Sequence, residues 1–325
     1  MQRVLAIDSG GTKCDALLVD EEGVALGWGR CAFADPGSGR GLSGSGRARE
    51  TVVRAVTLAL GEQRCDVLHL VPGFRWLQAE GCLNDPGRVI PYGTTEYDGP
   101  MALAGATEGV VALAGTGAFV WGRTRDGRTC HLDGLGPNLG DYGSGFQIGV
   151  LALRAAARSG WHPRHHTSLA ERVYRACVNA EEDHYGHGHG LVAYSLAHHD
   201  RAEIASLARI VGEEALRGDR IAREILQEAA TSLADTLYDV VERLGIRDEE
   251  YLLIGTGSIA TRSDVYWEHF CRLAHEFAPR LQPFRSPLPP VVGMALTALQ
   301  QIQPQRYETV RQRLLETAPG VIGPI

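Results

Sequence analysis

Hydrophobic residues near the N-terminus fall into two short runs, at 4–7 and 16–19, on either side of Ser-Gly-Gly-Thr. Short apolar runs that flank a glycine turn are typical of strands, so this pattern predicts a β-hairpin. Residues 23–29 predict a third strand of the same meander. A second strand–Gly-Thr-Gly–strand unit covers residues 110–120, and the two hairpins together predict a duplicated domain.

The rest of the chain alternates between helical and strand patterns. Apolar residues at helical spacing predict helices, and short continuous apolar runs predict buried strands. The expected elements are a helix around 52–60, strands at 66–71 and 88–92, helices from 98 and at 146–157, a long helix at 221–244, a strand at 251–258 and a late helix from 291. This order predicts an α/β fold in which mixed sheets are flanked by helices.

Composition narrows the class of protein. A chain of 325 residues fits two domains of ordinary size. The net charge of −7 argues against broad nucleic-acid binding, and no apolar run is long enough for a membrane span. The seven cysteines are scattered without a Cys-x-x-Cys pair, so we expect reduced thiols, and the start of the chain in a strand predicts a cytoplasmic protein without a signal peptide.

The first glycine turn carries candidate phosphate chemistry. Asp8 ends the first strand, two glycines expose backbone N–H groups, and Thr12 and Lys13 follow. A carboxylate that holds Mg²⁺ through water, with amides and a hydroxyl around phosphate oxygens, suits a nucleotide. Lys13 is also the only lysine of the chain, which favours a role here for the compact ammonium group of lysine over the guanidinium group of arginine. The alternative is an ordinary hairpin with a solvated turn.

Asp98 precedes Gly-Pro and a helical pattern, so it is predicted to be an N-cap, with Pro100 in the first turn. Four motifs then occur in a defined order. They are Asp-x-Gly-Gly-Thr at 8–12, the Asp98 helix that ends in Ala-Leu-Ala-Gly-Ala, Ala-Gly-Thr-Gly at 114–117 and Gly-Asp-x-Gly-Ser-Gly at 140–145. This ordered set resembles the N-acetylglucosamine kinase branch of the sugar kinase and actin superfamily, which also contains the BadF/BadG-type ATPases.

The resemblance covers roughly residues 4–300 and implies a fold. It implies two ribonuclease-H-like (actin-like ATPase) domains, each a mixed five-stranded sheet flanked by helices, with a cleft between them. The expected ranges are 1–109 and 110–325, with the last helices packing back across the hinge.

The resemblance also implies an activity, the transfer of the γ-phosphoryl group of MgATP to a hydroxyl of an amino sugar. Asp98 would be the catalytic base and Asp8 would hold Mg²⁺ through water. The implied ATP-binding and phosphate-binding residues are Gly10, Gly11, Thr12, Lys13, Thr116, Gly117, Gly255 and Gly257. The implied sugar-binding residues are Asp35, Gly134, Gly136 and Asp141. The expected partners are a small sugar and ATP, and no binding to nucleic acid or membrane is expected. Whether the protein forms a homodimer is left open.

Three positions depart from the family pattern, and all are where the family contacts substrate. Asp35, before Pro36, stands in place of asparagine; Tyr97 replaces the asparagine before the catalytic aspartate; and Tyr142 replaces a glutamate. A carboxylate at 35 suits a free ammonium, so glucosamine is a candidate acceptor beside N-acetylglucosamine. The alternative is that Asp35 only shapes an Asp-Pro turn.

Two other classes of protein are alternatives to the kinase. A BadF-type activator uses an iron–sulfur cluster that bridges two subunits, but residues 112–117, where that branch has a cysteine, contain none. A sugar-sensing regulator would normally carry a DNA-binding module, whereas this chain begins at the strand of Asp8.

A histidine-rich stretch contains the spacing His184-x-x-His187-x-His189, which could bind a transition metal. Glycines separate these histidines, and no carboxylate or cysteine lies between them. We therefore expect a surface loop and no structural metal.

Overall fold

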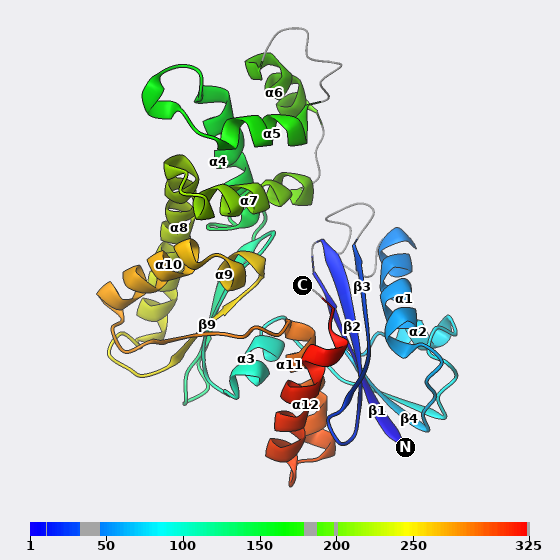
Figure 1. Ribbon diagram of the computed structural model, residues 1–325. Helices are drawn as coiled ribbons and strands as arrows, with labels where there is room; N and C mark the ends of the chain where they lie inside the picture. Colours follow the sequence, from blue (N-terminus) through cyan, green and yellow to red (C-terminus); the bar gives the residue numbers. More distant parts are fainter. Residues whose placement is uncertain (11, 33–45, 179–186, 198–200, 324–325) are drawn as a thin grey trace. The chain divides into compact units, whose positions relative to one another are not determined.

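The computed structural model describes residues 1–10, 12–32, 46–178, 187–197 and 201–323 (Figure 1). By its contacts the chain divides into unit 1, Met1–Thr107 with Ser286–Ile325, and unit 2, Glu108–Arg285. The C-terminal segment from Ser286 thus packs with the first sheet, although the expected second range, 110–325, includes it and allows only for the last helices to pack back.

Unit 1 contains a five-stranded mixed sheet. Its strands are β1 (Gln2–Ser9), β2 (Lys13–Asp20), β3 (Ala25–Ala32), β4 (Val67–Val71) and β5 (Arg88–Pro91), in the order β3-β2-β1-β4-β5. The first three strands form an antiparallel meander, and β4 and β5 run parallel to β1. The hairpin and the third strand predicted from the apolar runs are therefore present.

Helices cover both faces of this sheet, as Figure 1 shows. They are α1 (Gly46–Leu60) and α2 (Arg75–Ala79) on one face, and α3 (Asp98–Ala104), α11 (Pro290–Ile302) and α12 (Tyr307–Val321) on the other. The side chains of β1 alternate between the two faces of the sheet and so belong to two cores. Leu5 and Ile7 pack toward α1, while Val4 and Ala6 pack toward α11.

Unit 2 repeats the same sheet. Its strands are β6 (Gly109–Ala114), β7 (Ala118–Arg123), β8 (Thr129–Asp133), β9 (Leu252–Thr256) and β10 (Gln282–Arg285), in the order β10-β9-β6-β7-β8. Again the first three strands are antiparallel neighbours and the last two run parallel to the first. The duplicated α/β fold with two mixed five-stranded sheets is confirmed.

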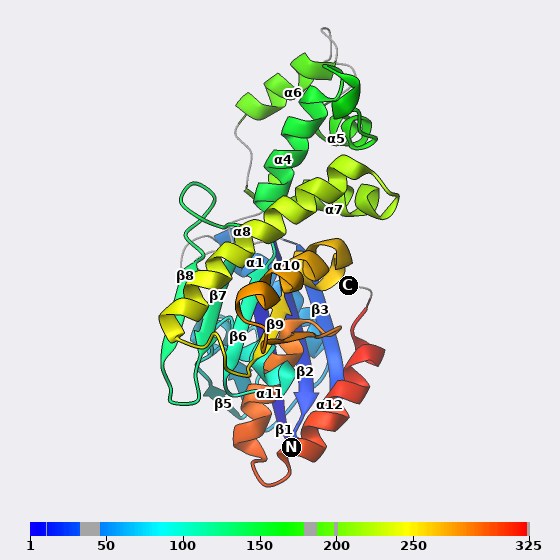
Figure 2. The same ribbon diagram turned by 90° about the vertical axis from the view of Figure 1, so that its left-hand side faces the viewer.

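The helices of unit 2 fall into two groups. The first is α4 (Gly145–Arg158), the short 3-10 helix η1 (Pro163–His165), α5 (Leu169–Cys177), α6 (His187–Leu196) and α7 (Arg201–Leu216). The second is α8 (Arg220–Leu244), α9 (Ser258–Arg262) and α10 (Asp264–Phe277). Figures 1 and 2 both show α4–α7 gathered beyond one end of the second sheet.

The prediction of a surface loop for the histidine-rich stretch is wrong in part, because α6 begins at His187. His184 lies outside the described residues, as do the side chains of His187 and His189. None of the helices in the described ranges is both long and apolar enough to cross a bilayer.

Candidate active site

The first glycine turn joins β1 to β2. The Gly10 N–H donates to the carbonyl oxygen of Lys13 at 3.0 Å, which closes the turn. Thr12 is partly buried, and Gly11 lies outside the described residues. The turn thus leaves Asp8 one residue before the end of β1 and Lys13 at the start of β2.

Asp8 faces a second carboxylate across the hairpin. In the register of β1 and β2, Asp8 lies directly opposite Asp15, so both side chains point to the same face of the sheet. Burial and the negative charge of Asp15 together raise the pKa of Asp8 to about 6, against the opposing effect of Lys13. Among the described residues Asp8 forms no salt bridge, so its charge is left for a cation.

Asp15 is held by two cations, Arg30 on the neighbouring strand β3 and Lys13 on its own strand β2. It is 1% exposed, and Nη2 of Arg30 donates to its Oδ2 at 2.9 Å while Nε of Arg30 donates to its Oδ1. Nζ of Lys13 lies 3.4 Å from the same Oδ2. The Lys13 side chain remains 39% exposed, and burial lowers its pKa. Sequence reasoning did not single out Asp15 or Arg30, although hairpin symmetry about the turn places Asp15 opposite Asp8.

Asp98 lies in the first turn of α3, where Tyr97 and not Asp98 takes the N-cap position. The predicted N-cap is wrong because the Asp98 carboxylate bonds backward along the chain: its Oδ2 accepts from the Thr95 N–H at 2.6 Å and from the Thr94 hydroxyl at 3.3 Å. In the described part of the chain, Oδ1 accepts no hydrogen bond.

Two glycines let α3 and α11 cross with their backbones in contact. A Cβ on Gly293 would lie 1.9 Å from the carbonyl oxygen of Gly99, and a Cβ on Gly99 would lie 2.7 Å from the carbonyl oxygen of Pro290. Helix α11 also packs on β1. The helix that carries Asp98 and the strand that carries Asp8 are thus both braced by α11.

The second glycine turn, Gly115–Gly117, joins β6 to β7 in unit 2. The Gly115 N–H donates to the carbonyl oxygen of Gly117 at 2.9 Å, and the Gly145 N–H at the start of α4 donates to the carbonyl oxygen of Gly115 at 2.7 Å. The positive end of the α4 dipole is therefore directed at the turn that carries Thr116, which favours an anion there.

The third glycine turn follows β9 and touches the second. Gly257 has φ of +85°, and a Cβ on it would lie 2.4 Å from the carbonyl oxygen of Ala114. Only glycine fits this approach. Gly255 allows the Trp267 ring to pack closely against the backbone, because a Cβ on Gly255 would lie 2.5 Å from that ring.

Asp133 organises the loop between β8 and α4. Its carboxylate accepts from the N–H groups of Asp141 at 2.6 Å and of Tyr142 at 2.7 Å. A Cβ on Gly140 would lie 2.1 Å from Oδ1 of Asp133, so a larger residue here would displace this carboxylate. Gly134 and Gly136, predicted to line the sugar, lie in this loop with φ of +76° and +90°. Tyr142 is exposed.

Asp141 is buried against the second glycine turn. It has φ of +59° and 1% exposure, its Oδ1 accepts from the Ala118 N–H at 3.2 Å, and Nη2 of Arg201 lies 2.7 Å from its Oδ2. A Cβ on Gly117 would lie 2.0 Å from Nη2 of Arg201. Asp141, in the loop before α4, and Arg201, at the start of α7, thus support the turn. Sequence reasoning missed Arg201 because no motif surrounds it.

The predicted site residues fall on both units. Unit 1 holds Asp8, Gly10, Thr12, Lys13 and Asp98, and unit 2 holds Thr116, Gly117, Gly134, Gly136, Asp141, Gly255 and Gly257. Gly11 and Asp35 lie outside the described residues.

Comparison with known proteins points to one family. The chain is 31% identical over 219 residues to an N-acetyl-D-glucosamine kinase of Dictyostelium discoideum, a match that covers 66% of this chain and 67% of the relative. It is 29% identical over 191 residues to an N-acetylmuramic acid/N-acetylglucosamine kinase of Clostridium acetobutylicum, which covers 57% of this chain and 60% of the relative.

Solved structures show the same fold. A candidate N-acetylglucosamine kinase from Chromobacterium violaceum aligns over 91% of this chain and 98% of its own, with a TM-score of 0.58 and 21% identity. A ROK family glucokinase from Streptomyces griseus, solved with glucose and AMPPNP, aligns over 92% of this chain and 99% of its own, with a TM-score of 0.56 and 17% identity. The sequence pattern of the BadF/BadG/BcrA/BcrD ATPase family matches residues 5–298, and the chain therefore belongs to this family.

Proposed function

We propose that the protein is an ATP-dependent kinase that phosphorylates a hydroxyl of an amino sugar of the N-acetylglucosamine or glucosamine type. Two relatives named for N-acetylglucosamine kinase activity, at 29% and 31% identity, support this function. The observation that carries it in the structure is the setting of Asp98 at the start of α3.

Asp98 suits the role of catalytic base. One of its carboxylate oxygens is fixed by Thr95 and Thr94, while the other accepts no hydrogen bond within the described residues. A carboxylate held in this way is oriented and still able to take the proton of an attacking hydroxyl. In this proposal Asp98 accepts that proton while the oxygen attacks the γ-phosphorus of ATP.

Asp8 fits the predicted role of holding Mg²⁺ through water. Its raised pKa, caused by burial and by Asp15, shows a carboxylate that a cation would stabilise. Bound Mg²⁺ would neutralise charge on the phosphate oxygens.

The glycine turns fit a role in binding the phosphate groups of ATP. Lys13 is exposed enough to reach a ligand while Asp15 restrains it, and Thr12 adds a hydroxyl beside it. In unit 2 the start of α4 supports the turn that carries Thr116 and Gly117. Phosphoryl transfer requires mainly positioning and charge neutralisation, which these groups supply.

Sugar binding is assigned to the loop that contains Gly134, Gly136 and Asp141, together with Asp35. Both oxygens of Asp141 already contact protein groups, so a sugar hydroxyl would share this carboxylate with Arg201. Asp35 bears on the choice of acceptor, because a carboxylate favours a free ammonium over an acetamide.

A coupled ADP-release assay tests the function. The acceptors are N-acetylglucosamine, glucosamine, N-acetylmuramic acid and glucose, with a reaction lacking acceptor as the blank. We expect ADP release that depends on an amino sugar. Sugar-independent ATP hydrolysis together with iron–sulfur absorbance would instead indicate a BadF-type activator.

The variant Asp98→Asn tests the base. Its amide oxygen can still accept from the Thr95 N–H, so the fold should survive while turnover falls about 10²–10⁴-fold. Asp66→Asn, at an exposed carboxylate of the same unit, is the control and should keep wild-type turnover. Near-normal turnover of Asp98→Asn would show that Asp98 has a structural role and is not the catalytic base.

A further inference from the structure

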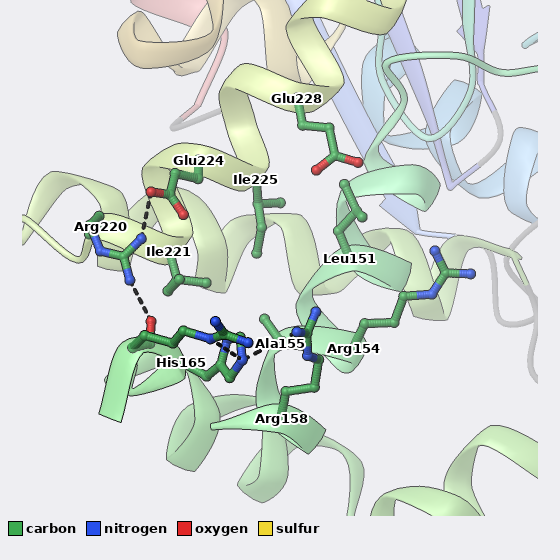
Figure 3. Close-up of a pocket in the computed structure, with 11 residues that line it drawn as sticks. Leu151, Arg154, Ala155, Arg158, His165, Arg220, Ile221, Glu224, Ile225 and Glu228 are labelled. Carbon is green, nitrogen blue, oxygen red and sulfur yellow. Dashed lines mark hydrogen bonds and ion pairs between the residues drawn. The ribbon is translucent and has the colours of Figure 1, made fainter. Parts of the chain in front are cut away.

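A pocket of about 700 Å³ lies in unit 2, apart from every residue assigned above to phosphate or sugar (Figure 3). Its walls come from the second half of α4, from η1 and from the first half of α8. The proposed kinase reaction leaves this pocket without a role.

The pocket is positively charged on a protein that is negatively charged. Arg154, Arg158, Arg164 and Arg220 line it, and Glu224 and Glu228 are the carboxylates among its lining residues. Four arginines against two glutamates leave a charge of +2, whereas the whole chain carries −7. A concave surface with this local charge attracts anions.

His165 holds two of these arginines beside each other. Its Nε2 accepts from Nη2 of Arg158 at 3.2 Å and from Nε of Arg164 at 3.1 Å, which requires a neutral imidazole. Burial lowers the pKa of His165, and the nearby positive charges of Arg158 and Arg164 lower it further. Neither arginine forms a salt bridge with any residue that the structure describes, so two guanidinium groups share a neutral partner and lack an anion.

Arg220 frames the pocket. Its Nη1 donates to Oε1 of Glu224 at 2.6 Å and its Nη2 donates to the carbonyl oxygen of Arg164 at 2.6 Å, both dashed in Figure 3. These bonds tie η1 to α8 and fix the backbone that presents Arg164.

The floor of the pocket is apolar. Leu151 and Ala155 from α4 and Ile221 and Ile225 from α8 form it (Figure 3). A free anion gains little from such a surface, whereas the carbon skeleton of a small molecule is stabilised on it.

We propose that this pocket binds a phosphorylated small molecule, whose phosphate pairs with Arg158 and Arg164 and whose carbon skeleton covers the apolar floor. A phosphomonoester carries close to two negative charges at neutral pH, which matches the charge of the pocket. Guanidinium groups present paired donors to phosphate oxygens.

The pocket and the second glycine turn can be occupied together. Helix α4 begins at the turn, where the Gly145 N–H donates to Gly115, and it lines the pocket from Leu151 to Arg158. At 1.5 Å per residue, Leu151 lies about 9 Å and Arg158 about 20 Å along the helix from Gly145. Binding at the pocket can therefore be measured while nucleotide sites are saturated.

Isothermal titration calorimetry on the full chain, saturated with AMPPNP and Mg²⁺, tests the proposal. The probes are glucose 6-phosphate and inorganic phosphate at matched ionic strength. We expect glucose 6-phosphate to bind, and to bind more tightly than inorganic phosphate because of the floor. The double variant Arg158→Gln/Arg164→Gln should weaken its binding at least tenfold.

The matched control is Arg175→Gln/Arg209→Gln, which removes two exposed arginines of α5 and α7 from outside the pocket. It should bind glucose 6-phosphate as the wild type does. Equal affinity of the wild type and the pocket variant, or no heat of binding at millimolar probe, would overturn the proposal. Equal affinity for glucose 6-phosphate and inorganic phosphate would overturn the proposed contact of the carbon skeleton with the apolar floor. The test is independent of kinase activity.

Discussion

Gly293 of α11 and Gly99 of α3 are in backbone contact: a Cβ on Gly293 would lie 1.9 Å from the carbonyl oxygen of Gly99. Gly99 follows Asp98 in the chain, so the closest approach of the two helices occurs beside the proposed catalytic base. A side chain at this crossing would push the base out of place.

Gly293→Ala should therefore lower both stability and turnover. Overpacking of a tight contact typically costs about 1–3 kcal/mol, and the helix that carries Asp98 would have to move. Thermal unfolding and kcat with the best acceptor measure the two effects. Gly212→Ala is the matched control, because this glycine lies inside α7 with nothing within 4 Å of a Cβ, and there alanine should stabilise the helix by about 0.5–1 kcal/mol. Equal behaviour of the two variants would contradict the importance of the crossing.

Much of the fold could be predicted from the sequence because apolar runs and glycine turns are local signals. The hairpin at Asp8 and the Gly-Thr-Gly hairpin of unit 2 have the expected strands, and the repeat of the two sheets follows from their similarity. The helices between 163 and 216 were not predicted, because the histidine-rich stretch within this segment favoured a surface loop.

The partners of the site residues could not be predicted, for two physical reasons. Arg30 meets Asp15 only after a register shift between β2 and β3 at Leu18/Val19, which counting along the chain does not show. Arg201 lies 60 positions after Asp141 in the sequence, with α4, α5 and α6 between them, and a pairing of this range leaves no periodic trace.

Arg30→Gln tests the restraint on Lys13. The change leaves Asp15 buried with Lys13 as its remaining cation, so Lys13 should be drawn to Asp15 and away from phosphate. Loss of one partner of a buried ion pair typically costs about 3–5 kcal/mol. We expect a lower melting temperature and a KM for ATP that rises by more than kcat falls.

The double variant Asp15→Asn/Arg30→Gln controls for the buried charge. Removal of both charges should recover most of the stability that Arg30→Gln loses. Unchanged ATP kinetics in Arg30→Gln would show that Lys13 does not depend on this pair.

The raised pKa of Asp8 predicts a cost to the stability of the ligand-free protein. Its folded-state pKa of about 6 lies above the ordinary value of 3.8, so the folded state binds this proton more tightly than the unfolded state does. Its contribution to the free energy of unfolding therefore falls as pH rises from about 4 to about 6, by about 3 kcal/mol. Asp8→Asn should be more stable than the wild type at pH 7 without Mg²⁺ or nucleotide, while losing kinase activity.

Urea unfolding at several pH values measures this difference. The advantage of Asp8→Asn over the wild type should grow between pH 4 and pH 6 and stay constant above. Asp126→Asn is a control of opposite sign, because hydrogen bonds from Thr124 and Arg128 lower the pKa of Asp126 to about 2. A variant Asp8→Asn that is less stable than the wild type at pH 7 would show that the carboxylate is stabilised within the ligand-free fold.

Asp141 has two candidate roles, and its contact with Arg201 separates them. As a structural residue it supports the second glycine turn through Arg201, at 2.7 Å, and through the Ala118 N–H. As a sugar ligand it would also bind a hydroxyl of the acceptor. Asp141→Asn and Arg201→Gln both break the ion pair, but only Asp141→Asn changes the group that would meet the sugar.

Both single variants should destabilise the protein, and the double variant should lose less than the sum because its members form one pair. If Asp141 binds the acceptor, Asp141→Asn should raise the KM for the sugar at least tenfold above that of Arg201→Gln, with the KM for ATP alike in both. The measurement is steady-state kinetics of the four proteins with the best acceptor. Equal sugar KM values in the two single variants would leave Asp141 as a support of the turn, because a ligand of the sugar cannot be replaced without a change in sugar binding.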